Sequence, residues 1–310
     1  MRRTAFLALT LAAPPAALLA QSAPLTTLRV GVIRAEVCGQ VFYGINQGFF
    51  SKNGLDAQVE FFNNGAAITA ALAGGALDIG LSDLGSAINA HARGIPVTYV
   101  APGLMFTDKT PTFAIIVPES SAIRDAKDVR GVFASSGIGT IAQLAAAAWV
   151  ERNGGNLKSI KFIEMPPPLV QSALTKGTIA ASTANEPWLT YAKENGFRVI
   201  VMTNGMAPAY MLSGWATTKD WVRKNAASVA KFVSAIHEAS VWANTNQATT
   251  APILAKYIGI PQAVIERMSY RGMFAETWSP GIVQPVIDAA AKLGHIPQPF
   301  PASELYYEAR

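Results

Sequence analysis

A glycine-rich turn with three hydroxyl side chains carries the sharpest chemical signal in the sequence. Residues 135–142 read Ser-Ser-Gly-Ile-Gly-Thr-Ile-Ala, between a predicted strand and a predicted helix. Free backbone N–H groups and the positive end of a helix dipole attract an anion or another polar group, and Ser135, Ser136 and Thr140 add hydroxyl donors. Two other interpretations stay open: plain helix capping, and a dinucleotide site, because the spacing also matches G-x-G-x-x-A.

Two further polar turns add carboxylates. Gly-Leu-Ser-Asp-Leu-Gly at 80–85 carries Ser82 and Asp83. Its spacing differs from the G-x-S-x-G of a hydrolase nucleophile, and helix capping and ligand contact are both open. Asn-Glu-Pro-Trp at 185–188 offers the carboxylate of Glu186 beside an amide and an indole. Catalysis has no positive support, because no carboxylate pair or nucleophile–base set stands out.

The composition predicts a globular chain that is large enough for about two domains. It has 310 residues, of which 50% are hydrophobic and 15% charged, and this excludes a disordered protein. Lys and Arg number 25 against 20 Asp and Glu. A surplus this small, without basic runs, argues against a nucleic-acid partner.

The first 20 residues have the layout of a secretory signal peptide. Positive charge in Met-Arg-Arg-Thr precedes a short apolar stretch and a small-residue segment that ends at Ala20. We predict cleavage after Ala20, with Ser22 and Ala23 as alternatives, and leave the general secretory and twin-arginine routes open. The apolar run is too short to span a bilayer, so we expect a soluble protein exported to the periplasm.

We expect neither a metal nor a bound cofactor. His91, His237 and His295 are scattered, without the i, i+4 spacing of helix-borne metal ligands. Cys38 is the only cysteine, so the chain has no internal disulfide and no cysteine-based metal site. A G-x-G match alone, in the middle of an exported chain, is weak support for a nucleotide.

Strands alternate with helices from residue 27 onward. Apolar strands are predicted at 27–33, 57–62, 77–81, 97–101, 112–118, 131–135, 160–164, 179–183 and 198–202. Predicted helices lie between them, several of them closed by glycine. This alternation predicts an α/β protein with largely parallel sheets. After Tyr210 the chain is predicted to be almost wholly helical, at 219–244, 247–258, 261–268 and 279–293.

Two α/β series with a helical tail predict a bilobed protein. We expect residues 25–113 and 215–310 to form lobe one, and residues 114–214 to form an inserted lobe two. Ligands in such sheets bind in the crevice at the carboxyl ends of the strands. This rule places five loops around one cleft, at 34–40, 63–66, 82–86, 135–140 and 184–188.

Five segments in a fixed order resemble a known group of proteins. They are 35–42, 45–59, 71–80, 121–131 and 185–188, and the likeness runs over about 28–244. The chain resembles the solute-binding proteins of ABC importers for nitrate, taurine, alkanesulfonates and thiamine-type pyrimidines. The resemblance implies a type II periplasmic binding fold and delivery of a small solute to a membrane permease with its ATPase. We expect such a protein to act as a monomer.

The resemblance also implies ligand-binding roles, assigned by loop position. They fall on Val37, Gln40, Phe42, Asn64, Ser82, Asp83, Ser135, Ser136, Thr140, Glu186 and, at the hinge, Tyr210. The solute is left open as a sulfonate, carboxylate, aromatic acid, pyrimidine-like or uncharged compound, since Arg34 is the only arginine beside the first loop. The cysteine cluster of the pyrimidine-synthesising relatives is missing, which argues against that activity. The alternative is an exported lyase-type enzyme on the same scaffold, with Asp83 or Glu186 as its base.

Overall fold

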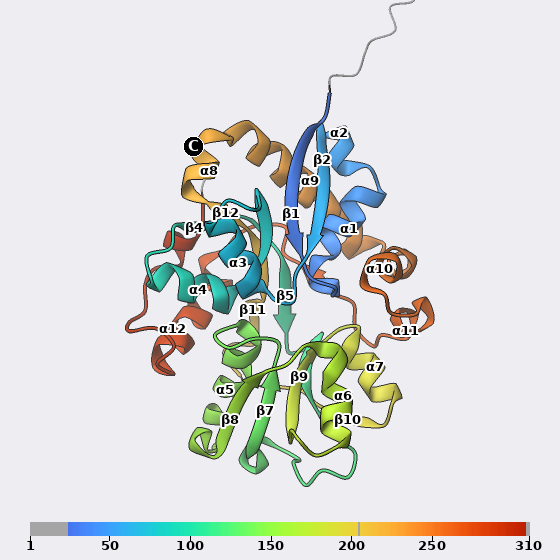
Figure 1. Ribbon diagram of the computed structural model, residues 1–310, viewed down its shortest axis with the longest axis vertical. Helices are drawn as coiled ribbons and strands as arrows, with labels where there is room; N and C mark the ends of the chain where they lie inside the picture. Colours follow the sequence, from blue (N-terminus) through green and yellow to red (C-terminus); the bar gives the residue numbers. More distant parts are fainter. Residues whose placement is uncertain (1–23, 204, 308–310) are drawn as a thin grey trace, which may run out of the picture.

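The structure, a computed structural model, describes residues 24–203 and 205–307. The predicted signal peptide lies outside the described residues. Figure 1 shows two halves, an upper one in blue, teal, orange and red and a lower one in green and yellow. We call them the first lobe and the second lobe.

The first lobe is built on a five-stranded sheet with the order β2-β1-β3-β12-β4. Its strands are β1 (Thr26–Val32), β2 (Leu55–Phe61), β3 (Ile79–Asp83), β4 (Val97–Pro102) and β12 (Ser213–Thr218). β1 pairs in parallel with β2 and β3, whereas β12 runs antiparallel to β3 and β4. Four strands therefore share one direction, and their carboxyl ends meet at one edge of the sheet.

The second lobe repeats this plan with the order β10-β6-β9-β7-β8. Its strands are β6 (Phe113–Pro118), β7 (Gly131–Ser135), β8 (Ile160–Glu164), β9 (Ala181–Asn185) and β10 (Phe197–Ile200). β7 is parallel to β8 and β9, and β6 is antiparallel to β9 and β10. The predicted α/β class with mostly parallel sheets is confirmed.

Helices cover both sheets, and the C-terminal tail packs mainly on the first lobe (Figure 1). The first lobe has α1 (Gly39–Asn46), α2 (Phe49–Lys52), α3 (Gly65–Ala73) and α4 (Leu84–Ala92), and the second has α5 (Ile141–Arg152), α6 (Pro167–Thr175) and α7 (Trp188–Glu194). The tail has α8 (Lys219–Lys224), α9 (Ala226–Thr245), α10 (Ala251–Ile258), α11 (Gln262–Glu266) and α12 (Gln284–Lys292). α9 lies against α1 and α2, and α12 lies against α4. None of the helices in the described part of the chain combines the length and apolar character needed to cross a bilayer.

Two predicted helices are divided in the structure. The helix expected at 41–52 is broken at Gly48, whose φ of 76° lies in the left-handed region that only glycine adopts readily. The helix expected at 219–244 is divided at Asn225 into α8 and α9. Each short helix buries one apolar side chain, Phe50 in α2 and Val222 in α8.

A small three-stranded sheet lies where the chain crosses between the lobes. Its order is β11-β5-β13, with β5 (Leu104–Thr107), β11 (Ala209–Met211) and β13 (Met273–Phe274). β5 and β11 are antiparallel, and Tyr210 of β11 stacks on Phe106 of β5 with ring centroids 4.8 Å apart. The two crossing segments therefore form one paired ribbon between the halves (Figure 1).

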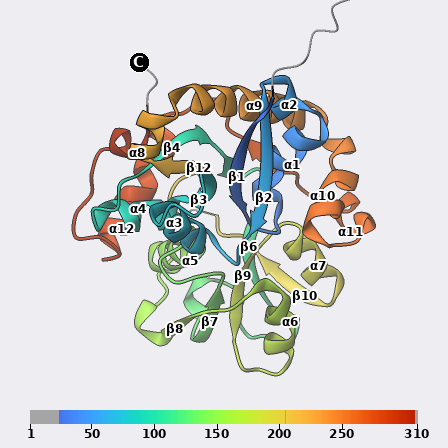
Figure 2. The ribbon, with the colours of Figure 1, turned by 45° about the horizontal axis from the view of Figure 1, so that its top comes forward.

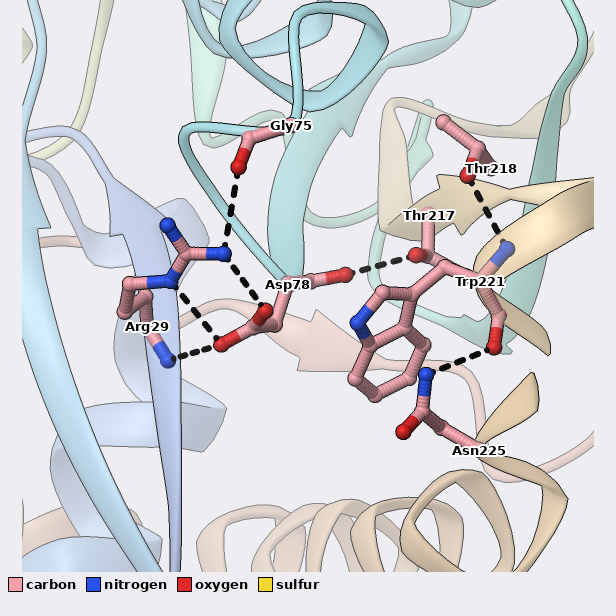
Figure 3. A network of polar contacts seen from close by, with 7 residues as sticks. All are labelled: Arg29, Gly75, Asp78, Thr217, Thr218, Trp221 and Asn225. Carbon is pink, nitrogen blue, oxygen red and sulfur yellow. Dashed lines mark hydrogen bonds and ion pairs between the residues drawn. The ribbon is translucent and has the colours of Figure 1, made fainter.

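An ion pair and a hydrogen bond together join three neighbouring strands of the first sheet, at the end where β3 begins (Figure 3). Arg29 of β1 holds the carboxylate of Asp78, with Nη2 2.8 Å from Oδ1, and its backbone N–H donates to Oδ2 at 2.8 Å. The carbonyl of Asp78, just before β3, accepts from the hydroxyl of Thr217 of β12 at 2.6 Å. Burial opposes ionisation of Asp78, but the hydrogen bonds from Arg29 outweigh it and lower the pKa of the carboxyl.

Asp78→Asn is expected to lower the free energy of unfolding at pH 7 by about 1 kcal/mol, a modest value because Arg29 is half exposed. A lowered pKa contributes stability above the ordinary value of 3.8, and this contribution is lost as the pH falls through the folded-state pKa. Urea unfolding at pH 7 and at pH 3 measures the difference, which should shrink at the lower pH. Asp220→Asn, in the exposed pair with Arg223, is the control and should leave the midpoint near that of the parent. An equal effect of both variants would contradict the structural role of Asp78.

Candidate ligand-binding cavity

A cavity of about 290 Å³ lies between the two lobes, at the carboxyl ends of their strands. All five loops that the sequence placed around a cleft contribute to its wall. One lining residue from each loop is Arg34, Asn64, Asp83, Ser136 and Asn185. The volume suits a small organic molecule that both lobes contact.

The cavity wall is mainly apolar. Aromatic rings come from both lobes, with Phe61 at the end of β2, Phe62 directly after it, and Phe113 and Trp188 in the second lobe. Three consecutive prolines, 166–168, add a rigid apolar edge where β8 passes into α6. Flat rings of this kind present large apolar surfaces that suit a planar solute.

The carboxylate of Asp83 joins the two lobes across this cavity. Asp83 ends β3 and caps α4, where its Oδ1 accepts from the backbone N–H of Ser86 at 3.0 Å and its Oδ2 from the Ser86 hydroxyl at 2.5 Å. Oδ1 also accepts from the backbone N–H of Ile141 at 2.6 Å, in the first turn of α5 in the second lobe. Burial raises the pKa of Asp83 while these three donors lower it, and the net direction is upward.

Two amide side chains of the first lobe also hold the turn that precedes α5. Asn64, the cap of α3, donates from Nδ2 to the carbonyl of Ser136 at 3.2 Å and to Oε1 of Glu164 at 3.1 Å. Asn89 of α4 donates from Nδ2 to the carbonyl of Gly139 at 2.8 Å. Figures 1 and 2 show α4 and α5 meeting where the lobes join.

Gly85 allows this close approach of the helices. A Cβ atom at Gly85 would collide with the backbone of Thr140 and Ile141 in the opposite lobe. The contact has no room for any side chain, because the atoms that would be struck belong to the backbone. The closed arrangement of the lobes therefore requires glycine at position 85, because every other residue carries a Cβ atom.

Two hydroxyl groups of the glycine-rich turn donate hydrogen bonds within the turn itself. Ser135 and Thr140 both donate to the carbonyl of Gly137, at 3.0 and 2.7 Å. The N–H of Gly139 donates to Oε1 of Gln143 at 2.7 Å. The side-chain cap of α5 thus comes from Asp83 of the other lobe rather than from Thr140 at its own N terminus.

Five of the sequence-predicted residues line the cavity and six lie outside its lining. Those that line it are Val37, Asn64, Asp83, Ser136 and Thr140. Those outside are Gln40, Phe42, Ser82, Ser135, Glu186 and Tyr210. Their ligand-binding roles remain predictions, and the structure shows what each outlying side chain contacts instead.

Three outlying residues of the first lobe are turned into its core. α1 begins at Gly39, so Gln40 and Phe42 lie on a helix rather than on a loop. Gln40 donates to the hydroxyl of Ser240 at 2.7 Å, and the Phe42 ring stacks on Tyr257 at a centroid distance of 4.4 Å. β3 continues through Asp83, so Ser82 and Asp83 point to opposite faces of the sheet, and the hydroxyl of Ser82 meets that of Thr69 at 2.8 Å.

The other three are held by partners of their own. Ser135 is buried at the end of β7, and Tyr210 is buried in the crossing ribbon against Phe106. The carboxylate of Glu186 accepts from the backbone N–H of Thr190 at 3.0 Å and from its hydroxyl at 2.9 Å, in the first turn of α7.

Several residues of the cavity wall are not among those predicted from the sequence, chiefly Phe61, Phe62 and the prolines 166–168. Phe61 ends β2, Phe62 follows it and the prolines follow β8, so the rule that ligands bind at carboxyl ends of strands would have found them. Arg34 was noted only as a neighbour of the first loop. Its guanidinium lies 4.0 Å from the ring centroid of Phe61, and its Nη1 donates to the carbonyl of Tyr257 at 2.8 Å.

Two buried carboxyl groups lie behind the cavity, where the first loop meets the start of α7. The backbone N–H of Glu36 donates to the carbonyl of Glu186 at 3.4 Å. Burial raises the pKa of each side chain to about 7. The carboxylate of Glu186 raises the pKa of Glu36 further, and the positive charge of Arg271 partly offsets the rise at both groups. Among the described residues, Oε2 of Glu36 has no hydrogen-bond partner.

The fold and the cavity agree with the comparison of the chain with protein families. Residues 21–259 match the model of the NMT1-like family. The chain belongs to the NMT1-like family.

Individual relatives and structures show the same likeness. A Brucella abortus (strain 2308) protein, named provisionally as a binding protein, is 26% identical over 279 residues, which cover 88% of this chain and 84% of the relative. The alkanesulfonate-binding protein SsuA from Xanthomonas axonopodis pv. citri, solved with bound MOPS, superposes with a TM-score of 0.77 at 18% identity, over 93% of this chain and all of that one. The periplasmic nitrate-binding protein NrtA from Synechocystis PCC 6803 gives a TM-score of 0.71 at 15% identity, over 88% and 83% of the two chains. At these identities the structures establish the periplasmic binding protein fold.

Glu36→Gln is expected to stabilise the protein above pH 7. A carboxyl whose folded-state pKa is raised from 4.5 to about 7 destabilises the fold as the pH rises through that window. The variant removes this penalty and should gain up to about 3 kcal/mol over the parent at pH 8, with little gain at pH 4.5. Urea unfolding across this pH range measures it, with Glu119→Gln on the surface as the control. A constant difference between Glu36→Gln and the parent at every pH would contradict the assignment.

Proposed function

We propose that this chain is the extracytoplasmic solute-binding subunit of an ABC importer. It captures a small organic solute in the cavity between the lobes and delivers it to a membrane permease driven by an ATPase. The observation that carries the proposal is the cavity of about 290 Å³ closed by hydrogen bonds from both lobes. Because each of these hydrogen bonds joins a group of one lobe to a group of the other, they form only when the two walls of the cavity come together.

The family and the fold support the same function. The Brucella relative is named as a binding protein, and the two structural neighbours bind alkanesulfonates and nitrate according to their names. In this proposal residues 25–113 with 215–310 move as one lobe and residues 114–214 as the other, about the paired strands β5 and β11. The chain acts as a monomer in the periplasm after removal of residues 1–20.

The alternative of a lyase-type enzyme has less support from the geometry. Glu186 lies outside the lining of the cavity and accepts two hydrogen bonds from Thr190. Asp83 lines the cavity, but both its oxygens accept hydrogen bonds from Ser86 and Ile141. A general base needs a free carboxylate within reach of the substrate proton. We infer that the solute leaves the protein unchanged.

A thermal-shift screen of the purified protein is expected to identify one solute class that raises its melting temperature. A ligand at about 100 times its dissociation constant stabilises the folded state by about 2.7 kcal/mol, which gives a visible shift. Mass spectrometry of the recovered compound then separates binding from turnover. An unaltered compound supports the importer subunit, and an altered one contradicts it.

Gly85→Ala is expected to weaken solute binding while leaving each lobe folded. The added methyl group collides with the backbone of Ile141 only when the lobes are closed. We expect the dissociation constant to rise by about tenfold or more, since a tenfold change corresponds to only 1.4 kcal/mol. Gly74→Ala, in the same lobe, is the matched control, because a Cβ there makes ordinary contacts. Small-angle scattering should show a more open Gly85→Ala protein, and unchanged affinity with unchanged scattering would contradict closure at this contact.

A further inference from the structure

The N-terminal ends of two helices in the cavity wall are already matched to a carboxylate of the protein. Each helix N terminus carries about half a positive charge, which usually attracts an anionic ligand. Here the 9-residue α4 and the 12-residue α5 meet at the single carboxylate of Asp83. Its oxygens accept from Ser86 of one helix and from Ile141 of the other. One fixed negative charge therefore compensates both helix ends.

Three of the neighbouring donors are also satisfied within the protein. The hydroxyls of Ser135 and Thr140 are bonded to the carbonyl of Gly137, and the N–H of Gly139 to Gln143. To use these three donors, an incoming sulfonate or carboxylate would have to displace their partners. Displacing a satisfied donor leaves its former acceptor unpaired, and this is costly in a partly buried site.

Charged side chains in the described part of the cavity wall are Arg34 and Asp83. Arg34 is exposed, lies over the ring of Phe61 and donates to the carbonyl of Tyr257, so solvent screens its charge. Asp83 lies deeper, between the two helix ends. A second anion near it would face a like charge in a region of low dielectric constant, which is strongly unfavourable.

The remaining wall favours a flat apolar solute. Phe61 and Phe62 in the first lobe, and Phe113 and Trp188 in the second, are part of the lining. Their faces contribute by burial of apolar surface and ring stacking, which require no charge on the solute. Asn63 and Asn185 are amides in the same wall that suit uncharged polar groups on its rim.

We infer that Asp83 sets the charge selectivity of this cavity: it serves as a built-in counter-ion for α4 and α5, so that the cavity takes an uncharged solute with a planar apolar ring and rejects sulfonates and carboxylates. This inference rests on the proposed function, because it names the class of solute that the binding protein would carry. Asp83 is also the residue whose replacement should open the site to anions.

Inorganic sulfate is the probe for anion binding at the N termini of α4 and α5 once the carboxylate of Asp83 has been removed. In isothermal titration calorimetry at neutral pH, the wild type is expected to show no saturable binding of millimolar sulfate. Asp83→Ala should acquire it, because the N–H groups of Ser86 and Ile141 lose their acceptor. Asp83→Gly also removes the acceptor and is well tolerated at a helix N-cap, and it is measured in the same way should Asp83→Ala fail to fold. Asp220→Asn is the matched control and should behave as the wild type.

Matched pairs of solutes test the selectivity of the wild type directly. Benzamide with benzoate, and benzenesulfonamide with benzenesulfonate, differ in charge but share a ring. We expect the wild type to bind the uncharged member about tenfold more tightly or better, and Asp83→Asn to narrow this preference. Tighter binding of the anion by the wild type overturns the inference. So does sulfate binding by the wild type, or its absence in every folded Asp83 variant that lacks a side-chain acceptor. If the protein binds neither member of a pair, the sulfate titration alone decides whether the inference on charge selectivity stands.

The same experiments separate this inference from the proposed function. If the protein is not a solute-binding subunit, no compound in the thermal-shift screen stabilises it, yet sulfate binding still appears in Asp83→Ala. If the inferred charge selectivity is wrong, a compound in the thermal-shift screen stabilises the protein, and the compound with the largest effect is an anion that binds the wild type with Asp83 in place.

Discussion

The hydrogen bond from the backbone N–H of Ile141 to the carboxylate of Asp83 is the contact on which the arrangement of the two lobes depends. Helix N termini leave N–H groups without partners, and a helix end buried at an interface needs an acceptor. α5 has no side-chain cap from its own N-terminal residue, Thr140, so its acceptor comes from the other lobe. The same carboxylate caps α4, and one side chain thereby satisfies two helices that belong to different sheets. Because the two helices approach each other this closely, any side chain at position 85 would collide with the backbone of Ile141.

In the proposed function, closure and solute binding are linked through that contact. Asn64, Asn89 and Asp83 all reach from the first lobe to the turn before α5, so the lobes share several polar contacts of modest individual strength. A solute shifts the balance between open and closed forms only through its different affinity for them. We propose that in the closed form the solute gains apolar contacts with rings of both lobes, such as Phe61 and Trp188 of the cavity lining. The paired strands β5 and β11 tie the crossing segments together, which favours a hinge motion over independent movement of the two connections.

Most of the fold could be predicted from the sequence, because alternating apolar strands and glycine-closed helices have few stable packings. The convergence of five loops followed from the carboxyl-end rule. Individual side chains could not be assigned in this way, since the side that a residue faces depends on where its element begins and ends. β3 extends to Asp83, which turns Ser82 toward Thr69, and α1 begins at Gly39, which places Gln40 and Phe42 in the core. The two-residue strand β13 has too little sequence for any periodic signal. The pairing of Asp83 with α5 joins residues 58 positions apart and depends on the tertiary structure.

A crystal structure of the protein with the solute that stabilises it most would show directly where the solute binds and what Asp83 contacts. We expect the solute in the cavity between the lobes, stacked among rings such as Phe61 and Trp188, with Asp83 still bonded to the N–H of Ile141. A solute bound elsewhere would contradict the binding function proposed for this cavity. A solute whose anionic group replaces Asp83 at Ile141 would contradict the role of Asp83 as the resident counter-ion.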